Sequence, residues 1–329
     1  MDVPNLFSYA TSERSQDAFI CWLLSWADPD VEEHNPALHA TAQDFVDALV
    51  RPHGYDDTVP VSSINVDTQD KGIDVVAIIN NEIALIIEDK VHASTHSNQL
   101  ERYKTALAKK YGDLDLCPVY FKTGEQSHYR NVREAGYSLF LREDFLTVLD
   151  DGARRDPESD IFENYHRHLK DLDRRINSFA NDPVGEWSRA GWKGFYQVLR
   201  DELGSGHWGY VPNQQGGFLG YYWHYRQVDG CEVYLQLEQE TLCFKVKVQN
   251  ESDYSRLRNQ WHSRVVEASE HHPIDVVKPG RFGYGEHMTV AIYPDDYRTT
   301  DEGEVIDIQS TVERLKQAES LVEEVSSME

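Results

Sequence analysis

Apolar runs along the chain predict where its strands and helices fall. Two short runs rich in β-branched residues, 73–79 and 83–87, are separated by Asn80, Asn81 and Glu82. Short β-branched runs favour strands over helices. Asn tolerates the left-handed backbone that a tight reversal needs. The stretch therefore predicts a β-hairpin.

Further elements are predicted on both sides of this hairpin. Apolar positions at helical spacing predict helices over 12–28 and 38–50, and alternation predicts a first strand over 59–67. A helix over about 97–111 and a buried strand over 116–122 follow the hairpin. The remaining elements of this half are a short helix, a fifth strand and a helix, over 128–136, 137–141 and 143–152. A helix between the third and fourth strands implies a crossover, so we expect a mixed sheet.

The second half changes character after a long polar helix predicted over 157–182. Three alternating runs joined by turn signals, with Asp229-Gly230 the clearest, predict an antiparallel meander. Further elements are a helix over 252–271, strands over 274–277 and 288–293, and an amphipathic helix over 304–328. We place the domain boundary at Pro183, which gives two domains, 1–183 and 184–329.

Aromatic residues crowd the start of the second domain. They are Trp187, Trp192, Phe195, Tyr196, Trp208, Tyr210, Phe218, Tyr221, Tyr222, Trp223 and Tyr225. Such rings can stack on unpaired bases. Aromatic residues in an antiparallel sheet more often form its core, and we favour that interpretation here.

Four charged residues belong to the apolar hairpin: Asp74, Glu88, Asp89 and Lys90. Successive strand residues point to opposite faces, so Glu88 and Lys90 share one face and Asp89 points to the other. Asp74 joins Glu88 if the two are cross-strand partners, which requires a three-residue loop over 80–82. A two-residue loop would separate the carboxylates unless a bulge intervened. We adopt the three-residue loop.

Two carboxylates beside a lysine suggest a cation site. Hard divalent cations such as Mg²⁺ take oxygen ligands, commonly one or two carboxylates with water and substrate phosphate. Asp74 and Glu88 supply carboxylates, and the backbone carbonyl of Asp89 is a further oxygen. A metal there acidifies bound water and offsets charge on phosphorus, while Lys90 orients that water or neutralises the phosphate. The alternative is a solvated strand end with an ordinary salt bridge, which the apolar surroundings weaken.

Asp74 and the Glu88-Asp89-Lys90 tripeptide on the next strand resemble the motif of the PD-(D/E)xK nuclease superfamily, with Ile73 in place of its proline. The resemblance implies an α/β fold for the first domain: a restriction-endonuclease-like αβββαβ core with a mixed central sheet flanked by helices. The C-terminal domain is then α+β with the antiparallel meander. In that family the aspartate and glutamate bind metal and the lysine assists the attacking water.

Two more segments are similar to parts of this family. Gln99 and Tyr103 lie four apart on one helical face, as in the Q-x-x-x-Y helix of the exonuclease branch related to RecB, where they approach the substrate backbone. Glu13 stands where uncharacterised bacterial members carry a helical glutamate that supports the metal. The implied catalytic residues are Asp74, Glu88, Lys90, Gln99, Tyr103 and Glu13. The implied ligands of Mg²⁺ or Mn²⁺ are Asp74, Glu88, the backbone carbonyl of Asp89 and, through water, Glu13.

The net charge of −25 works against tight nucleic-acid binding, because a duplex-binding protein usually carries a basic surface. Three explanations stay open: local basic residues near the site, a basic partner subunit, or adaptation to high salt. The local candidates are Lys104, Lys109, Lys110, Lys122, Arg130 and Arg133.

Composition also bounds the setting of the protein. No apolar run approaches the roughly 20 residues of a spanning helix, and the first residues lack the pattern of a signal peptide. The four cysteines form no C-x-x-C pair. We therefore expect reduced thiols, a cytoplasmic protein and no membrane association.

The leading hypothesis is a metal-dependent nuclease that hydrolyses phosphodiester bonds of nucleic acid, with DNA as the first candidate. The resemblance places it in restriction, repair, recombination or phage defence, and the C-terminal domain is expected to choose the target or a protein partner. The alternative is a catalytically silent binding or assembly subunit that kept the fold. A metal-dependent hydrolase of another phosphate ester is a third hypothesis.

Overall fold

The computed structural model describes residues 4–70, 73–91, 99–213 and 216–328. It divides into two compact units, residues 1–174 and 175–329, and the division falls earlier than the boundary expected at Pro183. Helix α6, Asp160–Ile176, explains this position. Its residues Phe162 and Tyr165 belong to the core of the first unit, whereas Phe179, just after it, belongs to the second.

The first unit is built on one mixed sheet of order β1-β2-β3-β4-β5. Its strands are β1 (Ile64–Asp70), β2 (Ile73–Ile79), β3 (Ile83–Lys90), β4 (Asp115–Lys122) and β5 (Ser138–Leu141). The β1-β2-β3 pairs are antiparallel, and the β3-β4 and β4-β5 pairs are parallel. The predicted mixed sheet and the αβββαβ order are confirmed.

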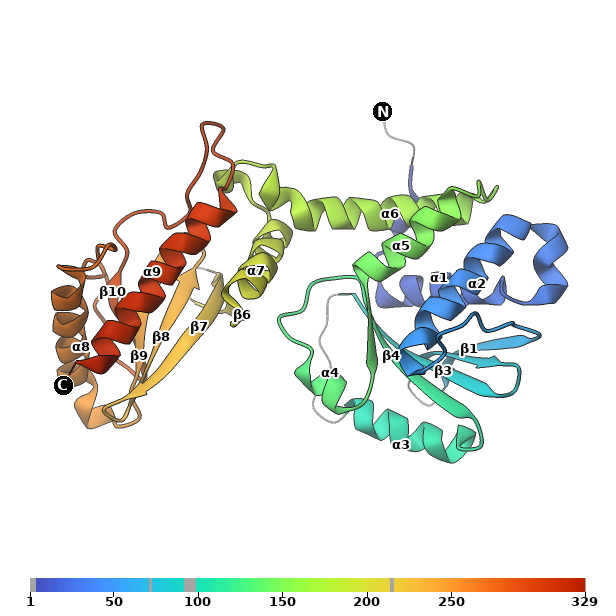
Figure 1. Ribbon diagram of the computed structural model, residues 1–329, viewed down its shortest axis with the longest axis horizontal. Coiled ribbons are helices and arrows are strands. Elements are labelled where there is room, and N and C mark those ends of the chain that lie inside the picture. The colour runs from blue at the N-terminus through green and yellow to red at the C-terminus, as the bar shows by residue number, and fades with distance from the viewer. Residues whose placement is uncertain (1–3, 71–72, 92–98, 214–215, 329) are drawn as a thin grey trace. The chain divides into compact units, whose positions relative to one another are not determined.

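Helices cover both faces of this sheet (Figure 1). They are α1 (Glu13–Ser25), α2 (Pro36–Val50), α3 (Gln99–Tyr111), α4 (Arg130–Glu134) and α5 (Arg142–Ala153). The α1, α2, α5 and α6 helices share the main apolar core with one face of the sheet. The α3 and α4 helices pack on the other face, around Leu100, Tyr120 and Val132.

The hairpin register is the one adopted from the sequence. Ile79 pairs with Ile83, which leaves a three-residue loop, and the ladder reaches Val75 opposite Ile87. Continued by one residue beyond the ladder, this register sets Asp74 opposite Glu88. Both loop asparagines have a φ of 55°, in the left-handed region that Asn tolerates.

The first strand begins five residues later than the expected 59–67. Pro60 has no N–H to give to a ladder. The following backbone is instead bound by the hairpin loop, because the side-chain carbonyl of Asn80 accepts hydrogen bonds from the N–H groups of Ser62 and Ser63 at 2.7 and 3.2 Å. The segment ahead of Ile64 is therefore held by a side chain rather than by strand pairing.

The second unit contains a five-stranded antiparallel sheet of order β10-β9-β8-β7-β6. Its strands are β6 (His207–Val211), β7 (Phe218–Val228), β8 (Cys231–Glu238), β9 (Thr241–Lys247) and β10 (His287–Ile292). Its helices are α7 (Arg189–Leu203), α8 (Tyr254–Ser269) and α9 (Ile308–Ser327). The predicted meander is confirmed. The strand expected over 274–277 was wrong: only Val277 makes a single bridge, with Ile292.

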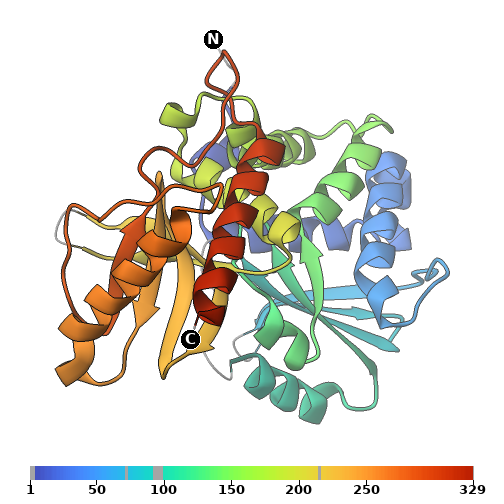
Figure 2. The ribbon, with the colours of Figure 1, turned by 60° about the vertical axis from the view of Figure 1, so that its left-hand side comes forward.

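The three helices of this unit share one apolar core with the sheet. Figure 2 shows α8 and α9 running across the same side of the strands. Most of the crowded aromatic residues are buried in this core: Trp187, Trp192, Phe195, Tyr196, Trp208, Tyr221 and Trp223. The core interpretation is confirmed for these rings. It fails for Tyr210 and Tyr225, which are exposed, and for Phe218 and Tyr222, which are half-buried outside this core.

Two further predictions concern the cysteines and membrane-spanning helices. All four cysteines are free thiols. Within the part of the chain that the structure describes, no helix has both the length and the apolar character needed to cross a bilayer.

Candidate active site

Three oxygen atoms of the hairpin converge on one ammonium group. The Nζ of Lys90 lies 3.1 Å from Asp74 Oδ2 and 2.9 Å from Glu88 Oε1. It also donates a hydrogen bond of 2.6 Å to the backbone carbonyl of Asp89. These are the three oxygen donors that the sequence proposed for a cation, and they lie together on the face that the register predicted.

The strands bring this group together through local geometry. Asp74 is the second residue of β2, while Glu88 and Lys90 end β3 two residues apart. The N–H of Asp89 also donates to Asp74 Oδ2 at 2.9 Å, which fixes the aspartate beside the end of the neighbouring strand. The predicted separation of Asp89 is confirmed, because its side chain points to the opposite face and contacts α1.

Burial makes the electrostatics of this site strong. The side chains of Glu88 and Lys90 are 2% and 10% exposed, and that of Asp74 is 23% exposed. Burial and the Asp74 charge raise the pKa of Glu88 to about 7, against the opposing effect of Lys90. Burial alone would lower the pKa of Lys90, but Glu88 and Asp74 outweigh it and raise that pKa. The ammonium therefore stays charged and compensates the two acids.

This donor set fits a hard divalent cation. Within the described ranges, no group of three or more His, Cys, Asp or Glu side chains is placed to hold a metal. Mg²⁺ does not need such a cage, since it commonly uses one or two carboxylates and keeps several waters. Two carboxylates and a carbonyl that already surround a positive charge meet this requirement.

Glu13 lies beside the end of β3. It is the first residue of α1, and its Oε1 accepts a hydrogen bond of 3.1 Å from the N–H of Val91. The carboxylate of Glu13 also adds to the negative field that raises the pKa of Glu88. The structure thus brings Glu13 to the same end of the hairpin, while its action through a water molecule stays a prediction.

A buried network behind the site holds Asp89. Gln16 of α1 donates to Asp89 Oδ1 at 2.5 Å. The other end of its amide, Oε1, accepts from Thr123 Oγ1 at 2.8 Å and from the hydroxyl of Tyr165 at 2.9 Å. All four residues are at least 93% buried. Because the amide of Gln16 is hydrogen-bonded at both ends, it fixes the orientation of Asp89 and of the carbonyl beside Lys90.

Asp17 completes this network as an acid pair with Asp89. Neither Asp17 Oδ1 nor Asp89 Oδ2 has a donor among the described residues, and the two carboxyl groups face each other. Burial and then the Asp74 charge raise the pKa of Asp17 to about 6. Burial and the charge of Asp17 raise the pKa of Asp89 well above its usual range. A single proton shared between the two carboxyl groups would satisfy both oxygens.

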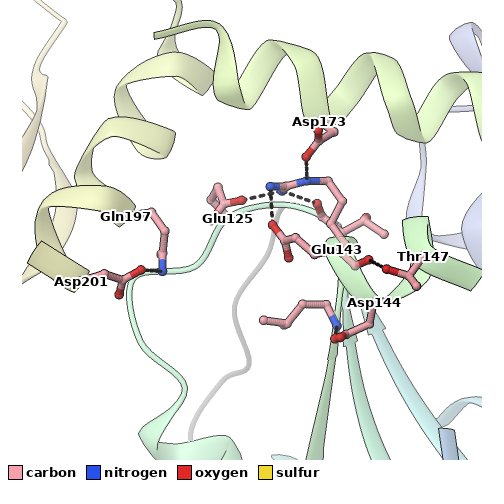
Figure 3. Close-up of polar contacts among 10 residues, drawn as sticks. Glu125, Glu143, Asp144, Thr147, Asp173, Gln197 and Asp201 are labelled. Carbon is pink, nitrogen blue, oxygen red and sulfur yellow. Dashed lines mark hydrogen bonds and ion pairs between the residues drawn. The ribbon is translucent and has the colours of Figure 1, made fainter. Parts of the chain in front are cut away.

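The end of β4 is clamped by Arg142. Its Nη1 donates to the carbonyl of Thr123 at 3.1 Å, and its guanidinium pairs with Glu125, Glu143 and Asp173 at 2.5, 2.8 and 2.9 Å. Figure 3 shows these three carboxylates around the guanidinium. The Arg142 side chain is only 4% exposed. The clamp holds Thr123, and through it the amide of Gln16.

The α3 helix carries the other two proposed site residues. The side chain of Gln99 lies outside the described residues. Tyr103 is partly buried and packs against an apolar cluster that includes Val76 and Ile86 of the sheet. Its ring therefore has a packing role, and its predicted contact with substrate stays a prediction.

Basic residues gather on the site's face of the sheet. Five of the six candidates lie on α3 and α4, which cover that face: Lys104, Lys109, Lys110, Arg130 and Arg133. The sixth candidate, Lys122, is the last residue of β4. It is only 1% exposed and lies beside Lys90 in the register of β3 and β4.

Sequence patterns did not reveal five residues around the site: Gln16, Asp17, Thr123, Tyr165 and Arg142. The sequence did hold a signal for Gln16 and Asp17. Both polar residues fall on the buried stripe of α1, where apolar residues are expected. No local pattern marks the others, which come from distant elements.

The mixed sheet flanked by helices, with two carboxylates and a lysine meeting on its central hairpin, defines the first unit as an α/β domain. A model of the PD-(D/E)XK nuclease superfamily matches residues 4–171, more than half of the 329 residues. The chain belongs to this superfamily, whose members are generally phosphodiesterases that use divalent metals, although some are inactive. Searches of curated proteins and of solved structures found no match.

Proposed function

We propose that this protein is a metal-dependent nuclease that hydrolyses phosphodiester bonds of nucleic acid, with DNA as the first candidate substrate. The convergence of Asp74, Glu88 and the Asp89 carbonyl on a single positive charge carries the proposal. Membership of a nuclease superfamily supports the same reaction class. Restriction, repair and phage defence are the settings we consider.

Each residue has a distinct role in this proposal. Asp74, Glu88 and the carbonyl of Asp89 would hold Mg²⁺ or Mn²⁺, with Glu13 binding an outer water. Such an ion supplies an acidified water and offsets charge on phosphorus. Lys90 leaves its three oxygens, orients the nucleophilic water and neutralises a phosphate oxygen.

Substrate would approach over α3 and α4. Gln99 and Tyr103 orient its backbone, and the lysines and arginines of these two helices provide local positive charge in an acidic chain. This arrangement favours the first of the three explanations of the net charge. The C-terminal unit chooses the target or a protein partner.

A non-cleaving binding or assembly subunit is the second candidate, and the net charge of −25 favours it. Lys90 already pairs with both carboxylates, so a hairpin of this kind has a positive charge beside its acids without a metal. A buried acid pair beside a lysine nevertheless destabilises a scaffold, because desolvating charged groups costs free energy.

Cleavage assays distinguish the two. Purified full-length protein is incubated with linear, circular and single-stranded DNA and with RNA, with Mg²⁺, Mn²⁺ or EDTA. We expect metal-dependent hydrolysis that Asp74→Ala and Lys90→Ala abolish. Asp67→Ala removes an exposed carboxylate from the same sheet and should leave the rate unchanged.

Hydrolysis that survives both site substitutions would assign the activity to a contaminant or another site. Absence of hydrolysis on every substrate would favour the binding subunit. A metal-dependent release of phosphate from small esters, without cleavage of nucleic acid, would instead favour another phosphate-ester hydrolase.

A further inference from the structure

The sheet of the second unit has one face away from its helices, and that face carries a groove of about 610 Å³. In the described part of this unit, α7, α8 and α9 all pack into the core on the opposite face. The groove volume lies within the range of roughly 300–1,000 Å³ typical of small-ligand sites. Its lining combines aromatic rings, two lysines, two histidines and two glutamates, so it is formally neutral in a strongly acidic chain.

Four rings of similar orientation form a row along the groove. His207 stacks on Tyr222 with centroids 5.2 Å apart and planes at 24°. His207 and Tyr225 are 6.2 Å apart at 12°, and Tyr225 and Tyr234 are 5.2 Å apart at 15°. Tyr225 is 39% exposed. A row of near-parallel rings with exposed members is a platform for another flat π system.

Glycine and a bulge create this row. A side chain at Gly220 would place its Cβ 2.8 Å from the hydroxyl of Tyr222, so the ring of Tyr222 lies over a position that only glycine leaves open. The register between β7 and β8 shifts between Trp223 and Arg226. The bulge brings Tyr225 to the same face as Tyr222, although their spacing is odd.

Polar groups lie beside the rings at the base of the groove. Lys245 Nζ donates to Glu238 Oε1 at 3.2 Å and to Thr289 Oγ1 at 2.9 Å. Gln236 Nε2 donates to the same glutamate oxygen at 2.9 Å. Gln236 and Lys245 are only 4% and 8% exposed. Buried donors and acceptors at fixed positions next to a stacking surface can read the edge of a polar ring.

We propose that this groove binds an unpaired nucleobase of a single-stranded nucleic acid. The base stacks on the ring row of His207, Tyr222 and Tyr225. Its edge meets the amide of Gln236 and the Lys245–Glu238 pair. Lys247, at the rim, contacts the adjoining phosphate. This inference rests on the proposed function, and it makes the second unit the part that selects unpaired substrate.

A nucleobase matches the groove better than a peptide or a duplex. A base offers a flat face and an edge with both donors and acceptors, which the rings and the polar base of the groove complement. An extended peptide would have to pair with the open edge of a sheet, whereas the rings and polar groups of the groove lie on the face of the sheet. A duplex hides its base faces and would demand more positive charge than two lysines beside two glutamates supply.

Binding is measured without cleavage to keep this inference separate from the nuclease proposal. Full-length Lys90→Ala protein in EDTA is titrated against fluorescein-labelled oligonucleotides by anisotropy. The probes are single-stranded DNA, single-stranded RNA, the matching duplex, and a strand of equal length with abasic residues. We expect base-containing single strands to bind at least tenfold more tightly than the abasic strand or the duplex.

Substitutions test the ring row. Stacking contributes about 1–3 kcal/mol per base, or roughly 5- to 150-fold in affinity. Tyr222→Ala and Tyr225→Ala should each weaken single-strand binding within that range, and Tyr222→Phe should retain it. Tyr284→Ala removes a tyrosine that is 73% exposed elsewhere in this unit and should change nothing. Thermal melts check that each variant is folded.

The inference is overturned if the abasic strand binds as well as the normal strand, or if Tyr222→Ala and Tyr225→Ala bind like the parent. If the wild type cleaves nucleic acid but these variants bind as tightly as the parent, the groove proposal alone is overturned. Loss of cleavage on every substrate, with base binding intact, would overturn the nuclease proposal alone.

Discussion

Replacing Lys90 by methionine removes the charge that holds two buried acids together. The ammonium lies 2.9 and 3.1 Å from the carboxylates of Glu88 and Asp74, at positions that water reaches little. Removing one partner of a buried ion pair costs about 3–5 kcal/mol. For a domain of about this size, 1 kcal/mol shifts the melting temperature by about 2–4 °C. We therefore expect the first unit to melt about 6–20 °C lower.

A divalent cation should reverse much of this loss. At a concentration of about 100 times its Kd, a ligand that binds only the folded state stabilises it by about 2.7 kcal/mol. In the wild type the ammonium of Lys90 competes for the same three oxygens. Mg²⁺ or Mn²⁺ should therefore raise the melting temperature of Lys90→Met more than that of the wild type.

The loss should also depend on pH. Burial already raises the pKa of Glu88 from 4.5 to about 7 in the folded state. A folded carboxyl that holds its proton more tightly than the unfolded chain loses stability as pH rises towards its folded pKa. Without Lys90 that pKa rises further, so the deficit should be larger near pH 8.5 than near pH 6.

Differential scanning fluorimetry at both pH values, with and without metal, measures these effects. Lys109→Met removes an exposed lysine of the same unit and serves as the matched control. An unchanged melting temperature in Lys90→Met would refute the reasoning. An equal metal response in Lys90→Met and wild type would show that the ammonium and the metal do not share a site.

Three further outcomes follow from the site. Cleavage should rise with pH up to the pKa of Glu88, about 7, because a protonated Glu88 binds metal poorly; a flat pH–rate profile below neutrality would contradict this. Asp89→Asn should keep cleavage far better than Glu88→Gln, because the new amide at position 89 can donate to Asp17 and still accept from Gln16. Equal losses of cleavage in the two variants would count against the network. Gln16→Leu should lower the free energy of unfolding by about 1–3 kcal/mol for each buried polar group that it leaves unsatisfied. A denaturant melt that matches the wild type would exclude the positioning role of Gln16.

Local patterns were enough to predict the hairpin and its acids. Strand periodicity predicted the faces of Glu88, Asp89 and Lys90, and the turn preference of the loop asparagines predicted the hairpin. The register adopted between the two possible loop lengths is the one observed. These features involve residues close in sequence, so a period and a turn preference carry the information.

Long-range contacts explain what the sequence did not reveal. The amide of Gln16 is held by Tyr165, 149 positions away, and no periodicity links two such residues. The start of the first strand was missed for the same reason, because the side chain of Asn80 binds the backbone at Ser62 and Ser63. The row of rings on the open face of the second sheet was missed because the bulge near Tyr225 turns that ring away from the core, to which simple alternation would assign it.

Diffraction from crystals grown with Mn²⁺, recorded for its anomalous signal, tests the cation site most directly. A single peak should lie about 2.1 Å from oxygens of Asp74, Glu88 and the Asp89 backbone, with the Lys90 ammonium moved away from all three. Crystals that show no peak there, with Lys90 still bound to the same oxygens at high Mn²⁺, would contradict the account.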